Sequence, residues 1–176
     1  MNHHFIYKTE MDEGEIVIEY SEAGVTFVTL PYDTRKELNK EEYKENAAIK
    51  AFFDDYFEGK SPDPNKIKLD IKVTEFQRKV YDILLNTKTG TVLTYGDVAK
   101  LIGCGAPRAV GQALRKNPVP IIVPCHRIVG SGWEGGFAGS TTGEKMDYKR
   151  YLLLLEKNNR KIKKIWIEIE LLQKLS

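Results

Sequence analysis

Residues 107–130 read PRAVGQALRKNPVPIIVPCHRIVG, and this stretch decides how the rest of the chain is interpreted. Pro107 suits the first turn of a helix, and the residues after it predict a helix that ends near Asn117. From Pro118 to Gly130 the chain is apolar and extended, and it carries a cysteine, a histidine and an arginine in succession. The stretch therefore predicts a short helix followed by a segment that presents a nucleophile.

Two further helices are expected upstream of this stretch. Thr74 is a candidate N-cap for a helix over residues 75–86, and Thr94 for a helix over residues 95–102. A glycine-containing break at residues 103–106 then leads into the helix that starts at Pro107. Two short helices joined by such a turn indicate a helix-turn-helix candidate.

The second helix of that pair has a polar face with a low surface. Arg108, Gln112 and Arg115 are spaced i, i+4 and i+7 and share one side, while Ala109 and Gly111 keep the surface low enough to approach a groove. An ordinary solvated surface helix explains the same spacing equally well, because isolated helix-turn-helix matches are weak evidence.

The two ends of the chain show different patterns. Residues 15–30 alternate as a hairpin of two strands, residues 40–57 have helical spacing, and residues 67–73 resemble another strand. A glycine-rich loop at residues 131–143 precedes a last helix from about Glu144 to Lys157. The basic tail at residues 161–172 has apolar residues at regular spacing, so we expect it to pack on the N-terminal unit rather than on phosphate.

Composition narrows the class of protein. The chain has 176 residues, 41% of them hydrophobic, which suits one mid-sized domain or two small ones. Its apolar runs fall far short of the roughly 20 residues of a membrane span, and residues 1–10 lack a signal-peptide stretch, so we expect an intracellular protein without a membrane partner. Two cysteines and three histidines show no zinc spacing, so we expect no metal and at least one free thiol.

Charge is distributed unevenly along the chain. Residues 1–73 carry 10 basic and 16 acidic side chains, a net charge of −6, whereas residues 74–156 carry 11 and 7 and residues 157–176 carry 6 and 2, a net charge of +4 each. This asymmetry suggests a polyanionic partner for the C-terminal part. Segments of this charge are common in other proteins, so charge alone does not assign the partner.

Cys125 needs a base if it is to act as a nucleophile. An unperturbed thiol with a pKa near 8.5 is only about 3% thiolate at neutral pH, and the thiolate is the reactive form. His126 is the sole histidine outside the first four residues, and Glu144, Asp147 or Glu156 could orient it. Spacing does not choose among the three, and a buried structural cysteine beside a hydrogen-bonded histidine is the alternative.

The motif Pro124-Cys125-His126-Arg127, together with RAVGQALR at residues 108–115 and NPVP at residues 117–120, resembles the O6-alkylguanine-DNA alkyltransferase family. Its members are also called methylated-DNA–protein-cysteine methyltransferases. The resemblance covers residues 74–157 closely and favours a functional role for both the cysteine and the helix-turn-helix. It implies an α+β fold, with a small ribonuclease-H-like N-terminal sheet and helix at residues 1–73 and a mostly helical domain at residues 74–176.

The resemblance also implies a reaction. The alkyl group of O6-alkylguanine in double-stranded DNA would be transferred irreversibly to Cys125, after minor-groove binding and nucleotide flipping. O4-alkylthymine is a second candidate lesion. No metal or redox cofactor is needed for this displacement, and each molecule acts once because the thioether product has no easy route back. The expected protein is a cytoplasmic monomer, associated with the nucleoid if it is prokaryotic.

Roles for individual residues follow from the resemblance. Cys125 is similar to the alkyl acceptor, His126 to the base that deprotonates it through a bridging water, and Glu156 to the residue that orients the base. Asn117 would hold the turn around the site. Tyr95 would hydrogen-bond guanine N3 and help guanine to leave.

The remaining candidates contact DNA or line the pocket. Arg108 matches the arginine that fills the space of the extruded nucleotide. The DNA-binding candidates are Thr94, Arg108, Ala109, Gly111, Gln112 and Arg115, and the pocket candidates are Pro120, Ile128, Trp133, Phe137 and Ala138. Ala138 stands where the family usually has serine, but it keeps the backbone N–H expected to contact guanine O6. Trp133 is unusual for the family, and we expect it to narrow the pocket against bulky adducts. Cys104 receives no role.

Three other functions fit parts of the sequence. A non-catalytic binder of alkylated DNA would keep the helix-turn-helix but replace the cysteine, and Cys125 argues against it. A cysteine hydrolase would need an oxyanion hole that the sequence does not reveal. A DNA-binding regulator would use Cys125 only structurally. Blocking the thiol separates these cases, because a regulator keeps its activity whereas an alkyltransferase loses repair.

Overall fold

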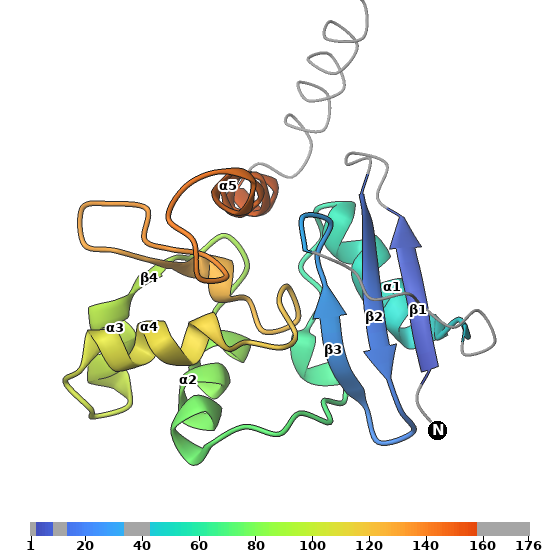
Figure 1. Cartoon of the computed structure of the whole chain (residues 1–176), viewed down its shortest axis with the longest axis horizontal. Helices are drawn as coiled ribbons and strands as arrows, with labels where there is room; N and C mark the ends of the chain where they lie inside the picture. Colours follow the sequence, from blue (N-terminus) through green and yellow to red (C-terminus); the bar gives the residue numbers. More distant parts are fainter. Residues whose placement is uncertain (1–2, 9–13, 34–42, 158–176) are drawn as a thin grey trace, which may run out of the picture.

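A small antiparallel sheet and a group of helices lie side by side in this protein (Figure 1). The computed structural model describes residues 3–8, 14–33 and 43–157. The sheet comes from the N-terminal part of the chain, and the helical group begins at Glu75. Among the described residues, no helix is both long and apolar enough to cross a membrane.

The sheet has three strands in the order β1-β2-β3: His3–Lys8, Glu15–Tyr20 and Val25–Thr29. β2 and β3 form the hairpin expected from the sequence, whereas β1 was not predicted. In the central strand Ile16, Val17 and Ile18 are all at most 2% exposed, so both faces of β2 are covered. An alternating sequence predicts one buried and one exposed face, whereas both faces of β2 are buried in the structure.

Helix α1 (Ala47–Phe57) lies behind the sheet (Figure 1) and buries five side chains: Ile49, Phe52, Phe53, Tyr56 and Phe57. Its first turn is capped by the side chain of Asn46, which accepts the N–H groups of Ala48 and Ile49. The prediction of a helix from residue 40 was therefore wrong over residues 43–46, because the helix begins only after its N-cap, Asn46. Residues 40–42 lie outside the described residues.

The strand predicted at residues 67–73 does not form. After the short 3-10 helix η2 (Pro64–Lys66), the chain meets β3 at one point, where the Val25 N–H donates to the Lys68 carbonyl and the Asp70 N–H to the Val25 carbonyl, each at 2.8 Å. The chain then leaves the sheet to enter the next helix at Glu75. An alternating pattern cannot produce a strand without a partner along its length.

Three short helices follow, and their caps agree with the sequence. They are α2 (Glu75–Leu85), α3 (Tyr95–Leu101) and α4 (Pro107–Arg115). Thr74 and Thr94 form capping boxes with Gln77 and Asp97, and Pro107 occupies the first turn of α4. Local side-chain chemistry thus defines the starts of all three helices.

Two short parallel strands connect α3 to the cysteine segment. β4 (Leu93–Thr94) pairs with β5 (Ile128–Val129), and β5 directly follows the 3-10 helix η3 (Cys125–Arg127). This pairing brings the start of α3 beside the cysteine. Helix α5 (Glu144–Lys157) packs against η3, and the predicted last helix is thereby present with the expected limits.

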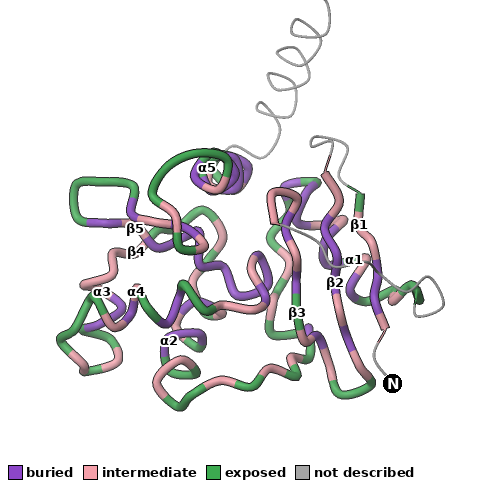
Figure 2. Tube along the Cα trace, in the orientation of Figure 1, coloured by how far each residue is buried: buried purple, intermediate pink, exposed green. Residues whose placement is uncertain are grey.

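The sheet unit and the helical unit share one buried core. Figure 2 shows buried residues along the strands and along α5, and both sets contribute to a single hydrophobic cluster. A backbone hydrogen bond of 2.8 Å from the Val28 N–H to the Pro118 carbonyl joins β3 to the cysteine segment. The basic tail at residues 161–172 lies outside the described residues.

Candidate active site

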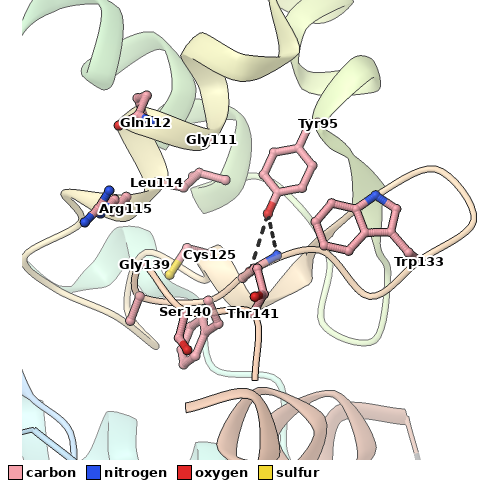
Figure 3. Close-up of a pocket in the computed structure, with 13 residues that line it drawn as sticks. Tyr95, Gly111, Gln112, Leu114, Arg115, Cys125, Trp133, Gly139, Ser140 and Thr141 are labelled. Carbon is pink, nitrogen blue, oxygen red and sulfur yellow. Dashed lines mark hydrogen bonds between the residues drawn. The ribbon is translucent and has the colours of Figure 1, made fainter. Parts of the chain in front are cut away.

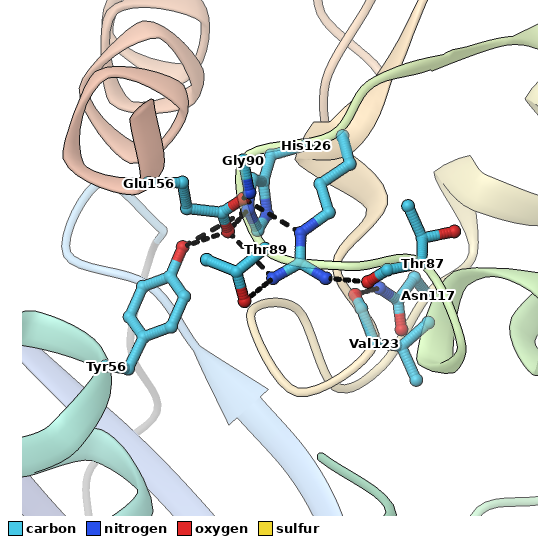
Figure 4. Close-up of polar contacts among 9 residues, drawn as sticks. Tyr56, Thr87, Thr89, Gly90, Asn117, Val123, His126 and Glu156 are labelled. Carbon is cyan, nitrogen blue, oxygen red and sulfur yellow. Dashed lines mark hydrogen bonds and ion pairs between the residues drawn. The ribbon is translucent and has the colours of Figure 1, made fainter. Parts of the chain in front are cut away.

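Cys125 occupies the first position of η3, at the end of a tightly held turn. The Asn117 side chain donates to the Val123 carbonyl at 2.9 Å (Figure 4) and accepts the Val119 N–H at 3.1 Å. Ile121 within this turn has a φ of 73°, an uncommon conformation for a β-branched residue. Asn117 thus bonds to both ends of the turn that precedes the thiol.

His126 contacts one of the three acidic candidates. Its Nε2 lies 2.6 Å from Glu156 Oε1, and both side chains are at most 1% exposed. Asp147 instead pairs with Arg150 on the surface, and Glu144 is exposed at the start of α5. The fold therefore selects Glu156, a choice that spacing left open.

Glu156 is the centre of a buried polar cluster (Figure 4). Arg127 donates through Nε to Oε2 at 2.9 Å and through Nη2 to Oε1 at 3.0 Å. Tyr56 of α1 donates to Oε1 at 2.8 Å, and the Gly90 N–H donates to Oε2 at 3.0 Å. The sequence predicted no role in the site for Tyr56 or Arg127, because their partners are distant in the chain.

The cluster fixes the protonation of the imidazole. Burial opposes the charge of Glu156, but hydrogen bonds from His126 and Arg127 prevail and hold its pKa well below the usual range. Because an ionised carboxylate has no proton to give, Nε2 of His126 carries the proton and donates it. Nδ1 is buried and has no hydrogen-bond partner among the described residues, so it is the free basic atom of the ring.

The free protein favours a neutral thiol and a neutral imidazole. Burial raises the pKa of Cys125, although a hydrogen bond with Asn117 and the charge of Lys149 lower it in part. Burial also lowers the pKa of His126, against the attraction of Glu156. Burial therefore disfavours proton transfer from the thiol to the ring, because both products are charged.

A cavity of about 320 Å³ opens against Cys125, between α4, Tyr95 and the loop at residues 133–141 (Figure 3). The Tyr95 hydroxyl accepts the Gly136 N–H at 3.1 Å and lies 3.4 Å from its carbonyl. Trp133, 57% exposed, lies at the rim beside Tyr95. The volume and the mixed lining suit a flat heteroaromatic ligand next to the sulfur.

The floor of this cavity includes a strained turn. Ala138 has a φ of 47°, and Gly139 beside it has a φ of 81°. This positive φ favours glycine at position 139, where a Cβ would also lie 3.0 Å from Nε of the Arg115 side chain. Phe137 of the same loop is buried and also lines the cavity.

Two predicted pocket residues lie elsewhere. Pro120 lines a second cavity of about 260 Å³, which also reaches Cys125 but opens toward β3 and Tyr32. Ile128 is fully buried and lines neither cavity. Of the other pocket candidates, Trp133 lines the first cavity only, and Phe137 and Ala138 line both.

Lys149 supports the cavity loop from below, a role that the sequence did not suggest. Its ammonium group is buried and donates to the carbonyls of Ile128, Glu134 and Gly136 at 2.6, 2.7 and 3.0 Å. Burial lowers its pKa to about 8, against the attraction of Cys125 and Glu134. A lysine inside an apolar helix face was the available signal, since lysine is almost never buried without partners.

The DNA-binding candidates lie on α4 or at the start of α3: Thr94, Arg108, Ala109, Gly111, Gln112 and Arg115. Arg108, Gln112 and Arg115 are exposed along α4, and Gly111, Gln112 and Arg115 also line the first cavity. The Thr94 hydroxyl is already bonded to Asp97, so its first role is to cap α3. Among the described residues, no three His, Cys, Asp or Glu side chains form a group that could hold a metal ion.

Comparison with known proteins identifies the family of the chain. Residues 75–158 match the family model for the 6-O-methylguanine DNA methyltransferase DNA-binding domain. The chain is 42% identical over 103 residues to a methylated-DNA–protein-cysteine methyltransferase of Metallosphaera sedula, a match that spans 58% of this chain and 62% of that protein, less than two thirds of its length.

Other relatives match over most of their length. A methylated-DNA–protein-cysteine methyltransferase of Methanosarcina mazei is 38% identical over 154 residues, 83% of this chain and 92% of that protein. The crystal structure of Mycobacterium tuberculosis OGT in complex with DNA superposes with a TM-score of 0.72 at 30% identity, over 89% of this chain and 94% of that one. The chain belongs to the methylated-DNA–protein-cysteine methyltransferase family.

Proposed function

We propose that this protein repairs DNA by transferring the alkyl group of O6-alkylguanine to Cys125. The observation that carries the proposal is a buried thiol at the floor of a cavity, next to a histidine whose Nε2 is held by Glu156 and whose Nδ1 is free. The names of its relatives support the same activity. The protein is then a methylated-DNA–[protein]-cysteine S-methyltransferase that acts once.

The reaction is a displacement at the alkyl carbon. Nδ1 of His126 takes the thiol proton through a bridging water, and the sulfur attacks the carbon bonded to guanine O6. A carbon–sulfur bond forms, the carbon–oxygen bond breaks, and its electron pair stays on guanine. Guanine takes up one proton, so charge is balanced, and a hydrogen bond from Tyr95 to N3 assists its departure.

Burial of the thiol and the imidazole gives this step a specific requirement. A duplex does not expose O6 to a group that is 6% exposed, so the damaged nucleotide must leave the stack and enter the cavity. Closure of the cavity by the base would exclude water from the sulfur. Arg108 on the exposed face of α4 would occupy the vacated space and offset part of the cost of extrusion.

The DNA complex is proposed on the same elements. Helices α3 and α4, joined at residues 102–106, act as a helix-turn-helix that enters the minor groove. A relative solved in complex with DNA supports this partner. The sheet unit at residues 1–73 serves as a ribonuclease-H-like scaffold domain for the DNA-binding and alkyl-acceptor domain at residues 74–176. We propose a cytoplasmic monomer, near the nucleoid in a prokaryote, that accepts O4-alkylthymine as a second lesion.

Intact mass spectrometry tests the reaction. The wild-type protein is incubated with a duplex containing O6-methylguanine, beside undamaged duplex and a Cys125→Ser variant. One methyl group gained by the wild type alone, only on damaged DNA and saturating at one per protein, is the expected result. DNA binding without any gain in mass would instead identify a lesion-binding or regulatory protein.

A further inference from the structure

Tyr56 connects the sheet unit to the base of the reaction. It lies on α1, is 3% exposed, and its hydroxyl lies 2.8 Å from Glu156 Oε1 and 3.2 Å from His126 Nε2. The two residues that it contacts come from α5 and η3. The Tyr56 phenol thus joins the polar cluster behind Cys125. No other residue of the sheet unit has an assigned chemical role.

The phenol and the imidazole share one carboxylate oxygen. Oε1 of Glu156 accepts from His126 at 2.6 Å, from Tyr56 at 2.8 Å and from Arg127 at 3.0 Å. Each donor stabilises the negative charge of the oxygen. An oxygen shared by three donors therefore stabilises a protonated imidazole less than an oxygen that serves His126 and Arg127 alone.

We propose that Tyr56 is a positioning residue that weakens the base of this site. By donating to Glu156 it lowers the proton affinity of His126, and so keeps Cys125 a neutral thiol until the damaged base arrives. The proposal rests on the proposed function in taking His126 as the base for Cys125.

The groups that face His126 act in a known direction. Glu156 on α5 raises the pKa of His126, whereas Arg127 in η3 and Lys149 on α5 lower it, and burial lowers it most. Burial and the Glu156 carboxylate raise the pKa of Tyr56 well above its usual value, so the phenol keeps its proton and remains a donor. Without this donor Glu156 stabilises imidazolium more strongly, and the neighbouring thiol loses its proton more readily.

Alkylation of Cys125 by iodoacetamide, without DNA, measures this effect. The sulfur displaces iodide, and the thiol proton passes through His126 to solvent. All proteins carry Cys104→Ser, so that one thiol reacts. Tyr56→Phe removes one oxygen and keeps the ring. We expect its plateau rate to rise about three- to tenfold and the midpoint of the acid limb to rise by about half a unit to one unit.

Tyr20→Phe is the matched control. Tyr20 lies on β2 of the same unit, is buried, and donates its hydroxyl to the Lys44 carbonyl at 2.8 Å. The same atom is lost at the same kind of position, and we expect no change in the rate profile. If Tyr56→Phe reacts at the wild-type rate or more slowly at every pH, the proposal is wrong, since a purely structural role cannot accelerate the thiol.

The same substitution in a Glu156→Gln protein tests whether Tyr56 acts through Glu156. The amide that replaces the carboxylate carries no charge, so the double variant Glu156→Gln/Tyr56→Phe should react at the same rate as Glu156→Gln alone. If Tyr56→Phe accelerates the reaction as much in the Glu156→Gln protein as in the wild type, Tyr56 does not act through Glu156. Methyl transfer from O6-methylguanine duplex is measured separately. A wild type that gains no methyl group would overturn the proposed function, while the iodoacetamide profiles would still decide the role of Tyr56.

Discussion

The two sides of Cys125 differ in how firmly their polar groups are held. Behind it, Glu156 receives five hydrogen bonds from His126, Tyr56, Gly90 and, twice, Arg127. In front of it, Gln112, Arg115 and Trp133 are exposed around the cavity. Groups that move a proton must keep their geometry, whereas groups that receive a base from DNA must accommodate it. The division suggests that the proton chemistry is preorganised and that substrate fit is not.

The largest effect should come from breaking the rigid side. Glu156→Gln leaves the buried Arg127 guanidinium without its counter-charge, and we expect a loss of about 3–5 kcal/mol in the free energy of unfolding. Urea denaturation measures it. Glu134→Gln, which removes a carboxylate from an exposed pair with Arg150, is the control and should change little.

The same variant gives a pH dependence with a defined sign. The pKa of Glu156 is depressed in the folded protein, so its contribution is complete above the unfolded carboxyl pKa of about 4.3 and is lost as the pH falls toward the folded value. The gap between wild type and Glu156→Gln should therefore narrow in acid. A gap that stays constant down to acid unfolding would mean that the Glu156 charge is not the stabilising feature.

The cavity side should respond in rate rather than in stability. Tyr95→Phe keeps the ring beside Gly111 but removes the hydroxyl that now contacts Gly136. If that hydroxyl assists the departure of guanine, single-turnover methyl transfer should slow by about a hundredfold. Binding to undamaged duplex, measured by fluorescence anisotropy, should be unchanged. An equal loss of binding and rate would place Tyr95 in DNA docking instead.

Lys149 lies between the two sides, because it fixes the cavity loop from within the core. Lys149→Met keeps the length of the side chain but leaves three carbonyls without their donor, and we expect a loss of about 1–3 kcal/mol in stability together with slower methyl transfer. Lys157→Met, at the exposed end of the same helix, is the control. Thermal unfolding measures the stability, and intact mass measures methyl transfer. Full activity in Lys149→Met would mean that the cavity loop keeps its conformation without the Lys149 hydrogen bonds.

The sequence predicted features that depend on neighbouring residues and missed those that depend on residues distant in the chain. Helix starts at Thr74, Thr94 and Pro107 depend on neighbouring residues, and all three were predicted. The contacts of Tyr56 with Glu156 and of Lys149 with Ile128 join residues that are 100 and 21 positions apart. No local pattern encodes such pairs, and for the same reason β1 was missed and the isolated segment at residues 67–73 was taken for a strand.

The smallest expected effect concerns the rim of the cavity. The Trp133 indole packs so closely on Gly130 that a methyl group there would collide with it, which fixes the ring beside the opening. We expect wild type to react slowly with O6-benzylguanine, and Trp133→Ala to raise that rate about tenfold or less while leaving methyl transfer unchanged, because only the larger adduct needs the added space. Competition between the two lesions in one reaction, followed by intact mass, gives the ratio directly. A ratio that Trp133→Ala does not alter would mean that adduct size is limited elsewhere, either at the turn of Ala138 or at the second cavity beyond Cys125.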